Sequence, residues 1–297
     1  MSTKKRPSGP LKSFLAGVAG STCGVILTCP LELIKTRNQS YFNMRYGGLN
    51  GVFRGMKNTV RNEGFFSLWK GCFIMICSVA PSRGIHFLVY ETMKTPLNKY
   101  YPNMSPTVNA LTRSILAGAT AVTFSNPIWV VKTRLQLQTN VDPELAKSNT
   151  RFKNYGGIVD AVRRIYREEG FKAFFRGLSV SYLGLLETAI QFTCYDVFKR
   201  KLNEHYEKPS KLQLFGTAAL AKLIATTLTY PHEVVRTRMR ERTVGKEYAT
   251  IISSFKSLYT KEGFRGLYAG YEAHVLRTVP NAAIMFIIVE MILNSSL

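Results

Sequence analysis

The sequence predicts an all-α membrane protein with six transmembrane helices arranged as three repeats. Three observations predict this fold class. Six apolar segments approach the ~20 residues that a helix needs to span a bilayer. Three charged motifs recur in the same order along the 297-residue chain. The net charge is +22, from 40 Lys and Arg against 18 Asp and Glu, which indicates an anionic partner.

Two of the apolar segments, residues 13–31 and 114–131, contain no charged residue. The other four, residues 71–90, 177–195, 212–231 and 275–289, contain one each: Arg83, Glu187, Lys222 and Arg277. Six such segments leave little chain for the surface of a soluble helical protein. A charge at the centre of a membrane helix costs at least ~2.5–3.5 kcal/mol, so it normally faces the bundle interior or a wet cavity. Because three of the four are cationic, the pattern favours an anion path.

Three strings repeat along the chain. CPLELIKTR recurs as NPIWVVKTR and YPHEVVRTR, with prolines at positions 30, 127 and 231. EGFFSLWKG recurs as EGFKAFFRG and EGFRGLYAG, and YETMK recurs as YDVFK and decays to VEMIL. The strings divide the chain into repeats at residues 8–99, 107–203 and 208–295. Each repeat is predicted to contain a helix with a central proline, a basic loop with a short amphipathic helix, and a returning helix.

Several other classes of function are disfavoured. The five cysteines form no CxxC or Cys/His cluster, so neither a metal site nor a disulfide framework is predicted. A Gly-rich phosphate loop, HExxH, GxSxG or a triad-like cluster is missing, so the chain is not expected to be an enzyme or to need a cofactor. Nucleic-acid binding is the alternative that the charge suggests, but the uncharged segments and the lack of a recognition motif oppose it.

The tripled motif Pro-x-acid-x-x-base-x-base, followed each time by acid-Gly and base-Gly, resembles the mitochondrial carrier family. The resemblance covers nearly the whole chain, from about residue 10 to residue 294. It implies six tilted helices around a pseudo-threefold axis, with short helices on the matrix side. It also implies a monomer in the inner mitochondrial membrane, with both termini toward the intermembrane space, cardiolipin as a lipid partner, and alternating access to a central site.

The resemblance implies a matrix gate where the three proline-kinked helices converge. Its predicted residues are Glu32, Lys35, Lys132, Glu233 and Arg236, with Gln39 and Gln136 as bracing glutamines. Family geometry pairs Glu32 with Lys132, and Glu233 with Lys35. Trp129 replaces the third acid, so Arg236 loses its usual partner, and Arg240 replaces the third glutamine.

A cytoplasmic gate is implied at the other end, with Glu91, Lys94, Asp196, Lys199 and Glu290 as its residues. The family pairing joins Glu91 to Lys199 and Glu290 to Lys94. Leu293 replaces the third base, so Asp196 is left without a partner. Each gate therefore holds two of three possible pairs, and an ordinary set of solvated helix-end charges is the competing explanation.

Family contact positions lie seven residues after each base-Gly glycine, at Ser78, Gly184 and Arg277. The spacing in the second repeat is one residue short, so Leu183 or Leu185 could replace Gly184. Arg277 is the strongest candidate ligand, because a guanidinium has the fork geometry for phosphate or carboxylate.

Four further residues are candidates for the substrate site. Lys222 lies eleven residues before Glu233, about 20° away around an ideal helix, so it is expected to face the same axis as the gate. Glu187 is expected to pair with Lys222 or Arg277 in the empty cavity, or to accept from a base or ribose. Arg83 faces either the cavity or a neighbouring helix, and Trp129 either stacks on a base or only packs.

The physical argument predicts an anionic substrate and favours a phosphorylated one, and the resemblance refines this to nucleotides. NPIWVVKTRLQLQ is similar to the branch that includes pyrimidine nucleotide, NAD, FAD and folate carriers. APSRGIHF, SVSYLGLLETAIQF and AKLIATTLTYPHEVVRTR are most similar to the pyrimidine nucleotide carriers. Exchange of pyrimidine nucleotides is therefore the expected function, with NAD, FAD or folate transport as the alternative.

Overall fold

The computed structural model describes residues 10–40, 47–138, 154–206, 209–241, 248 and 250–294. Within these ranges the chain is helical, which confirms the predicted all-α class. The six long helices are α1 (Pro10–Gln39), α3 (Cys72–Thr92), α5 (Pro106–Leu137), α8 (Leu178–His205), α9 (Lys211–Arg240) and α11 (Tyr271–Asn294). The shorter ones are α2 (Gly48–Glu63), η1 (Phe65–Trp69), α4 (Lys94–Tyr100), α7 (Ile158–Glu169), η3 (Phe171–Phe175) and α10 (Ile251–Leu267).

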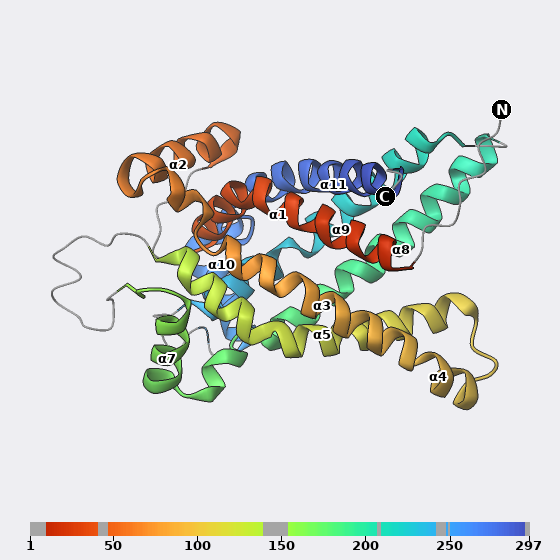
Figure 1. The fold of residues 1–297 in the computed structure, drawn as a ribbon, viewed down its shortest axis with the longest axis horizontal. Helices are drawn as coiled ribbons and strands as arrows, with labels where there is room; N and C mark the ends of the chain where they lie inside the picture. The colour runs from red at the N-terminus through yellow and green to blue at the C-terminus, as the bar shows by residue number, and fades with distance from the viewer. Residues whose placement is uncertain are drawn as a thin grey trace.

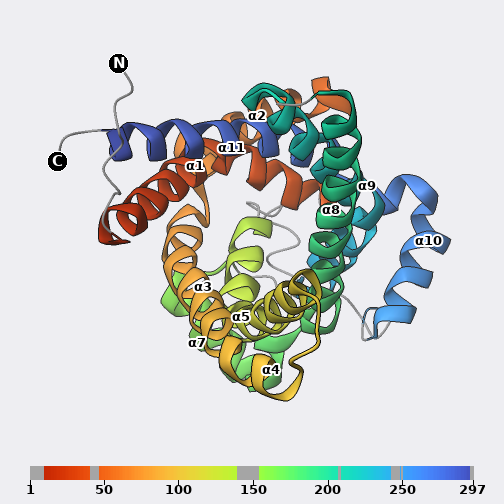
Figure 2. The same cartoon turned by 90° about the vertical axis from the view of Figure 1, so that its right-hand side faces the viewer.

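The long helices form a bundle that appears as a ring when viewed along its long axis (Figure 2). The short helices α2, α7 and α10 lie together at one end, which we call the linker-helix end, and α4 lies at the opposite end (Figure 1). The closest helix pairs are α1 with α11, α3 with α5, and α8 with α9. Each of these pairs joins two different repeats, so the repeats hold one another together.

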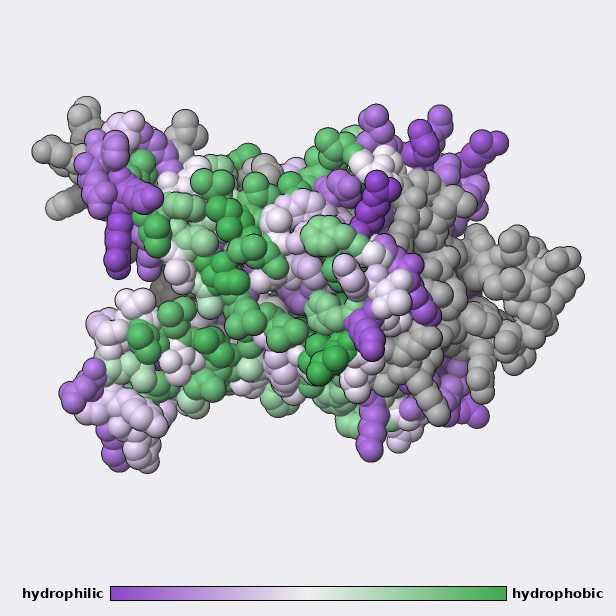
Figure 3. Space-filling model, turned by 180° about the vertical axis from the view of Figure 1, so that it is seen from behind, coloured by the Kyte–Doolittle hydropathy of each residue, from purple (hydrophilic) through white to green (hydrophobic). Residues whose placement is uncertain are grey.

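The outer surface is suited to a bilayer. Figure 3 shows hydrophobic side chains in a band across the middle and hydrophilic ones toward the two ends. Large apolar residues of the long helices, such as Phe87, Phe124 and Leu228, are exposed. Among the described residues, three segments are long and apolar enough to cross a membrane: residues 17–39, 65–100 and 106–137. Helices α8 and α9 are of similar length, 28 and 30 residues, but carry more charge.

Prolines lie inside the helices without ending them. Pro30, Pro127 and Pro231 fall within α1, α5 and α9, as the repeat predicts. A proline inside a helix removes one backbone hydrogen bond and kinks the axis. Two of the stretches just past these prolines are fully buried, because Glu32 to Ser40 and Val130 to Gln136 are all buried, whereas Glu233 and Arg236 after Pro231 are half-buried.

The glycine of each base-Gly motif allows the second helix of a repeat to start against a neighbouring helix. Gly71, Gly177 and Gly270 have φ values of 81°, 74° and 78°, which L side chains rarely adopt. A Cβ at Gly270 would lie 2.9 Å from the carbonyl oxygen of Lys35 on α1. A Cβ at Gly177 would lie 3.2 Å from the carbonyl oxygen of Arg236 on α9. These contacts position the second helices beside the gate residues.

Candidate functional site

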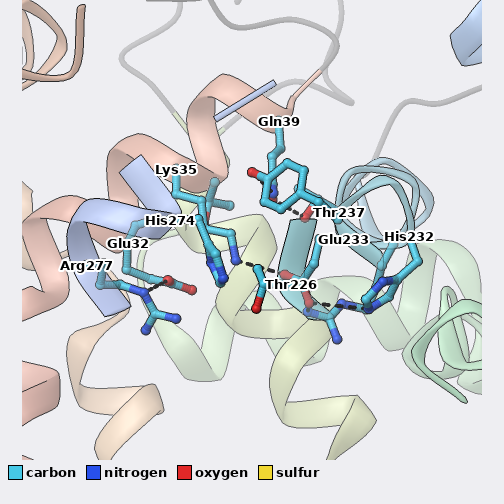
Figure 4. A network of polar contacts seen from close by, with 12 residues as sticks. Glu32, Lys35, Gln39, Thr226, His232, Glu233, Thr237, His274 and Arg277 are labelled. Atoms are coloured by element: carbon cyan, nitrogen blue, oxygen red, sulfur yellow. Dashed lines mark hydrogen bonds and ion pairs between the residues drawn. The ribbon is translucent and has the colours of Figure 1, made fainter. Parts of the chain in front are cut away.

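Ion pairs between repeats join the helices close to the linker-helix end, and Figure 4 shows their surroundings. Lys132 Nζ on α5 lies 2.6 Å from Glu32 Oε1 on α1. Lys35 Nζ on α1 lies 2.8 Å from Glu233 Oε2 on α9. The structure thus brings together both pairs expected for the matrix gate. The two lysine side chains are each 5% exposed, so water screens these pairs less than surface ion pairs.

The third connection, between α5 and α9, has no ion pair among the described residues. Arg236 donates instead to Glu233 of its own helix, three residues earlier. Glu233 therefore serves two cations, which the sequence reasoning did not foresee. Trp129 stands in the place of the acid, and its ring centroid lies 5.3 Å from Lys132 Nζ, a cation–π distance.

The predicted bracing glutamines reinforce the same helix pairs without touching the gate carboxylates. Thr36 on α1 donates to Gln136 Oε1 on α5 at 3.1 Å. Thr237 on α9 donates to Gln39 Oε1 on α1 at 2.8 Å, and Gln39 donates to the Tyr230 hydroxyl at 2.9 Å. Each glutamine thus adds a neutral hydrogen bond to a junction that already has an ion pair.

Arg240 replaces the glutamine at the third junction and is buried. Its Nη2 donates to Asn126 Oδ1 on α5 at 2.8 Å and to Ser181 Oγ on α8 at 3.0 Å. Asn126 in turn donates to the carbonyl oxygen of Phe174 at 2.8 Å. The α5–α9 junction is therefore held by hydrogen bonds from a guanidinium to neutral groups.

A second set of contacts occurs once in each repeat, two residues past the gate base of each proline-containing helix. Its arginines are the last base of each proline motif, and their Nε atoms donate to carbonyl oxygens of the next repeat: Arg37 to Gln136 at 3.2 Å, Arg134 to Arg240 at 3.1 Å and Arg238 to Gln39 at 2.5 Å. Each arginine also pairs with the acid of the acid-Gly motif in its own repeat: Glu63 at 2.7 Å, Glu169 at 2.5 Å and Glu262 at 2.9 Å. Both motifs were visible in the sequence, but no role was assigned to these residues.

The first of these pairs changes the ionisation of an acid outside the membrane-spanning helices. Burial opposes the ionisation of Glu63, but hydrogen bonds donated by Arg37 and Lys70 lower the pKa of its carboxyl group below the ordinary value. The charged form of Glu63 therefore stabilises the folded protein at neutral pH.

Arg277, the strongest substrate candidate, reaches the gate from α11. Its Nε lies 3.1 Å from Glu32 Oε2, an ion pair whose geometry is not that of an aligned hydrogen bond. The other oxygen of Glu32 accepts from Lys132. One carboxylate is therefore shared between the gate and the candidate substrate site, which the sequence reasoning did not foresee.

Lys222 forms a second candidate cluster with α8. Its Nζ lies 2.7 Å from Glu187 Oε1, one of the two partners expected for that acid. Thr226 also donates to Glu187 Oε1, at 2.8 Å. The Lys222 side chain is 39% exposed, so it is far more accessible than the gate lysines.

The remaining substrate candidates differ in position. Ser78 is buried and donates to the carbonyl oxygen of Met75 in its own helix at 2.7 Å, so its hydroxyl is occupied. Gly184 lies against α9, because a Cβ there would be 3.0 Å from His232 Nε2. Leu185 packs on α5, where its Cδ2 lies 2.8 Å from a Cβ built on Gly118. Arg83 is exposed on α3.

The predicted pairs of the cytoplasmic gate are not formed among the described side chains. Glu91 contacts Arg113 at 3.6 Å instead of Lys199, whose Nζ lies 5.8 Å from the ring centroid of Tyr195. Lys94 and Asp196 are exposed, and the side chain of Glu290 lies outside the described residues. A cavity of about 760 Å³ is lined by residues of α3, α5 and α8, among them Asp196. Helices α3 and α8, which carry Glu91 and Lys199, are not among the closely packed helix pairs, so these two side chains do not meet.

Comparisons with known proteins agree with this architecture. The family model described as mitochondrial carrier protein matches residues 6–101, 103–206 and 207–296. Solute carrier family 25 member 36-A of Danio rerio is 36% identical over 311 residues, covering 95% of this chain and 96% of the relative. The mitochondrial pyrimidine nucleotide transporter RIM2 of Saccharomyces cerevisiae is 34% identical, covering 93% and 84%. The mitochondrial nicotinamide adenine dinucleotide transporter 1 of the same yeast is 35% identical, covering 97% and 75%.

Proposed function

Because the chain belongs to the mitochondrial carrier family, we propose that it exchanges nucleotides, and pyrimidine nucleotides in particular, across the inner mitochondrial membrane. Membership in the family makes it a multi-pass transporter and not an enzyme. Two of the relatives are named as a pyrimidine nucleotide transporter and a nicotinamide adenine dinucleotide transporter. Nucleotides are therefore the common substrate class that these names support.

The observation that carries the proposal is the shared carboxylate of Glu32. It holds Lys132 of the gate through one oxygen and Arg277 through the other. An anionic group of the cargo that binds Arg277 would compete with Glu32 for this guanidinium. Competition of this kind would weaken a contact that closes the gate, and so would couple binding to opening.

The charges around this site support a cargo with more than one negative charge. Three separate ion-pair clusters contain five cationic side chains, Arg277, Lys132, Lys35, Arg236 and Lys222, and three carboxylates, Glu32, Glu233 and Glu187. With histidines neutral, the set has two uncompensated positive charges. A nucleoside di- or triphosphate would neutralise them, whereas an uncharged metabolite would not.

Alternating access is part of the same proposal. In the described state the matrix-gate pairs are closed, and Glu91 and Lys199 have other partners. Closure of the other end would bring Glu91 toward Lys199, and Glu290 toward Lys94, while the pairs of Glu32 and Glu233 separate. Ion pairs suit this exchange, because the attraction within a buried pair is largely offset by the cost of removing both charges from water, so the net contribution of the pair is small and it can break during transport.

Transport by purified protein in liposomes tests the proposal. Vesicles preloaded with UTP, CTP or TTP are expected to take up labelled pyrimidine nucleotide. Arg277→Ala and Lys222→Ala are expected to abolish exchange, and Arg54→Ala, at an exposed base on α2, serves as the control of equal charge loss. Uptake of NAD, FAD or folate without uptake of pyrimidine nucleotides would move the chain to the alternative. Normal uptake in both site variants would remove the site assignment.

A further inference from the structure

The base of the third repeat differs from its two counterparts in the matrix gate. Lys35, Lys132 and Arg236 each lie five residues after the proline of their helix. The two lysines pair with carboxylates of a neighbouring repeat and are 5% exposed. Arg236 pairs only within its own helix, and its side chain is 26% exposed. It is therefore the one base of these three that is accessible and has no inter-repeat carboxylate.

The sequence accounts for this difference through one residue. In the cyclic order of the pairs, the partner of Arg236 would stand on α5 at position 129, which is a tryptophan. An indole has no carboxylate oxygen to accept from Arg236, and this ring lies against Lys132. The α5–α9 junction therefore lacks the carboxylate that each of the other two junctions has.

Closure of the α5–α9 junction does not depend on Arg236. Arg240 already ties α9 to Asn126 of α5 and to Ser181 of α8. In addition, Arg134 of α5 donates to the carbonyl oxygen of Arg240. Arg236 can therefore leave Glu233 and bind a ligand while these α5–α9 contacts remain in place.

We propose that Arg236 is a substrate-contact residue and that a terminal phosphate of the cargo takes the place of the missing carboxylate. This inference rests on the proposed function, nucleotide exchange. A guanidinium carries five donors in a planar fork that matches phosphate, and the described contact of Arg236 with Glu233 occupies Nη2. Figure 4 shows Glu233, which holds Arg236, and Arg277 on opposite sides of one polar network.

The number of phosphates then determines how many of these cations the cargo engages. The single phosphate of a nucleoside monophosphate engages Arg277 alone. A di- or triphosphate extends to Arg236 and draws this arginine away from Glu233, which then retains only Lys35 of its two cations. The structure therefore assigns to Arg236 the discrimination between nucleoside triphosphates and monophosphates.

Transport measured with UMP, UDP and UTP tests this assignment. Arg236→Gln is expected to raise the KM for UTP at least tenfold and the KM for UMP less than threefold, and Arg236→Lys to retain part of the discrimination. Arg240→Gln, which introduces the residue of the other two repeats at a buried position, is the matched control. It is expected to change transport of all three nucleotides by the same factor.

A second variant keeps the assignment testable if Arg236→Gln does not fold. Trp129→Asp leaves Arg236 in place but supplies an internal carboxylate that competes with phosphate, so it also is expected to reduce the UTP-over-UMP preference. If wild-type protein exchanges nucleotides but both variants change UMP and UTP transport equally, Arg236 belongs to the gate alone and the inference is wrong. If wild-type protein exchanges no nucleotide, the proposed function itself has failed.

Discussion

Replacement of Glu32 by glutamine tests whether the closed gate depends on a buried, doubly used carboxylate. The Glu32 side chain is 10% exposed and contacts Lys132 at 2.6 Å and Arg277 at 3.1 Å. Glutamine preserves the shape but leaves the nearly buried Lys132 without a carboxylate. Loss of one partner of a buried pair is destabilising by about 3–5 kcal/mol, and we expect the low end, about 3 kcal/mol, because the cluster borders a wet site.

The expected effect converts into a measurable temperature shift. For a chain of this size each kcal/mol lowers the midpoint by about 2–4 °C, so Glu32→Gln is expected to lower the apparent Tm by about 6–12 °C. The assay is intrinsic tryptophan fluorescence of the detergent-purified protein during heating. Glu187→Gln is the matched control, because its partner Lys222 is 39% exposed and such pairs contribute less than about 1 kcal/mol. Equal Tm shifts in Glu32→Gln and Glu187→Gln would refute the argument that burial determines the cost of losing the carboxylate.

Three further predictions concern the gate and its support. Trp129→Asp is expected to raise the apparent Tm and slow exchange several-fold, since it gives Arg236 an inter-repeat partner; an unchanged rate would mean that these side chains do not meet. Asn126→Ala is expected to lower the apparent Tm, and Asn126→Asp to lower it less, because a charged contact with Arg240 partly offsets the lost donation to the Phe174 carbonyl oxygen; an equal loss in both variants would contradict a role for the contact with Arg240. The lowered pKa of Glu63 means that its stabilising contribution is present above the unfolded-state pKa of about 4.3 and is lost as the pH falls toward the folded-state value. The Tm difference between wild type and Glu63→Gln is therefore expected to narrow on acidification from pH 7 to pH 4, and a constant difference would contradict this.

Much of the architecture was accessible from the sequence because it depends on local pattern and repetition. Apolar length predicted membrane helices, and the tripled motif predicted three equivalent units. The substitution at Trp129 also identified the one junction without an ion pair. These inferences required only the order of residues along one helix and the equivalence of the repeats.

The open cytoplasmic pairs could not be predicted in the same way. Glu91 and Lys199 lie on α3 and α8, and the proposed alternating access would bring them together only in another conformation of the protein. In the described state Glu91 instead meets Arg113, whose guanidinium carbon lies 3.9 Å from the ring centroid of Tyr90. A sequence encodes both conformations, whereas one structure records the partners of a single conformation.

The sequence by itself determined the helices, the threefold repeat and the residues that face a common axis, because helical periodicity relates residues along one helix. Only the tertiary structure decided that the closest helix pairs join different repeats, that Glu32 serves both Lys132 and Arg277, and that Arg236 turns to Glu233. It also decided that Gly184, rather than Leu185, lies against α9. The physical reason is that the rotation and depth of one helix against another follow from packing across the whole bundle, which no single segment encodes.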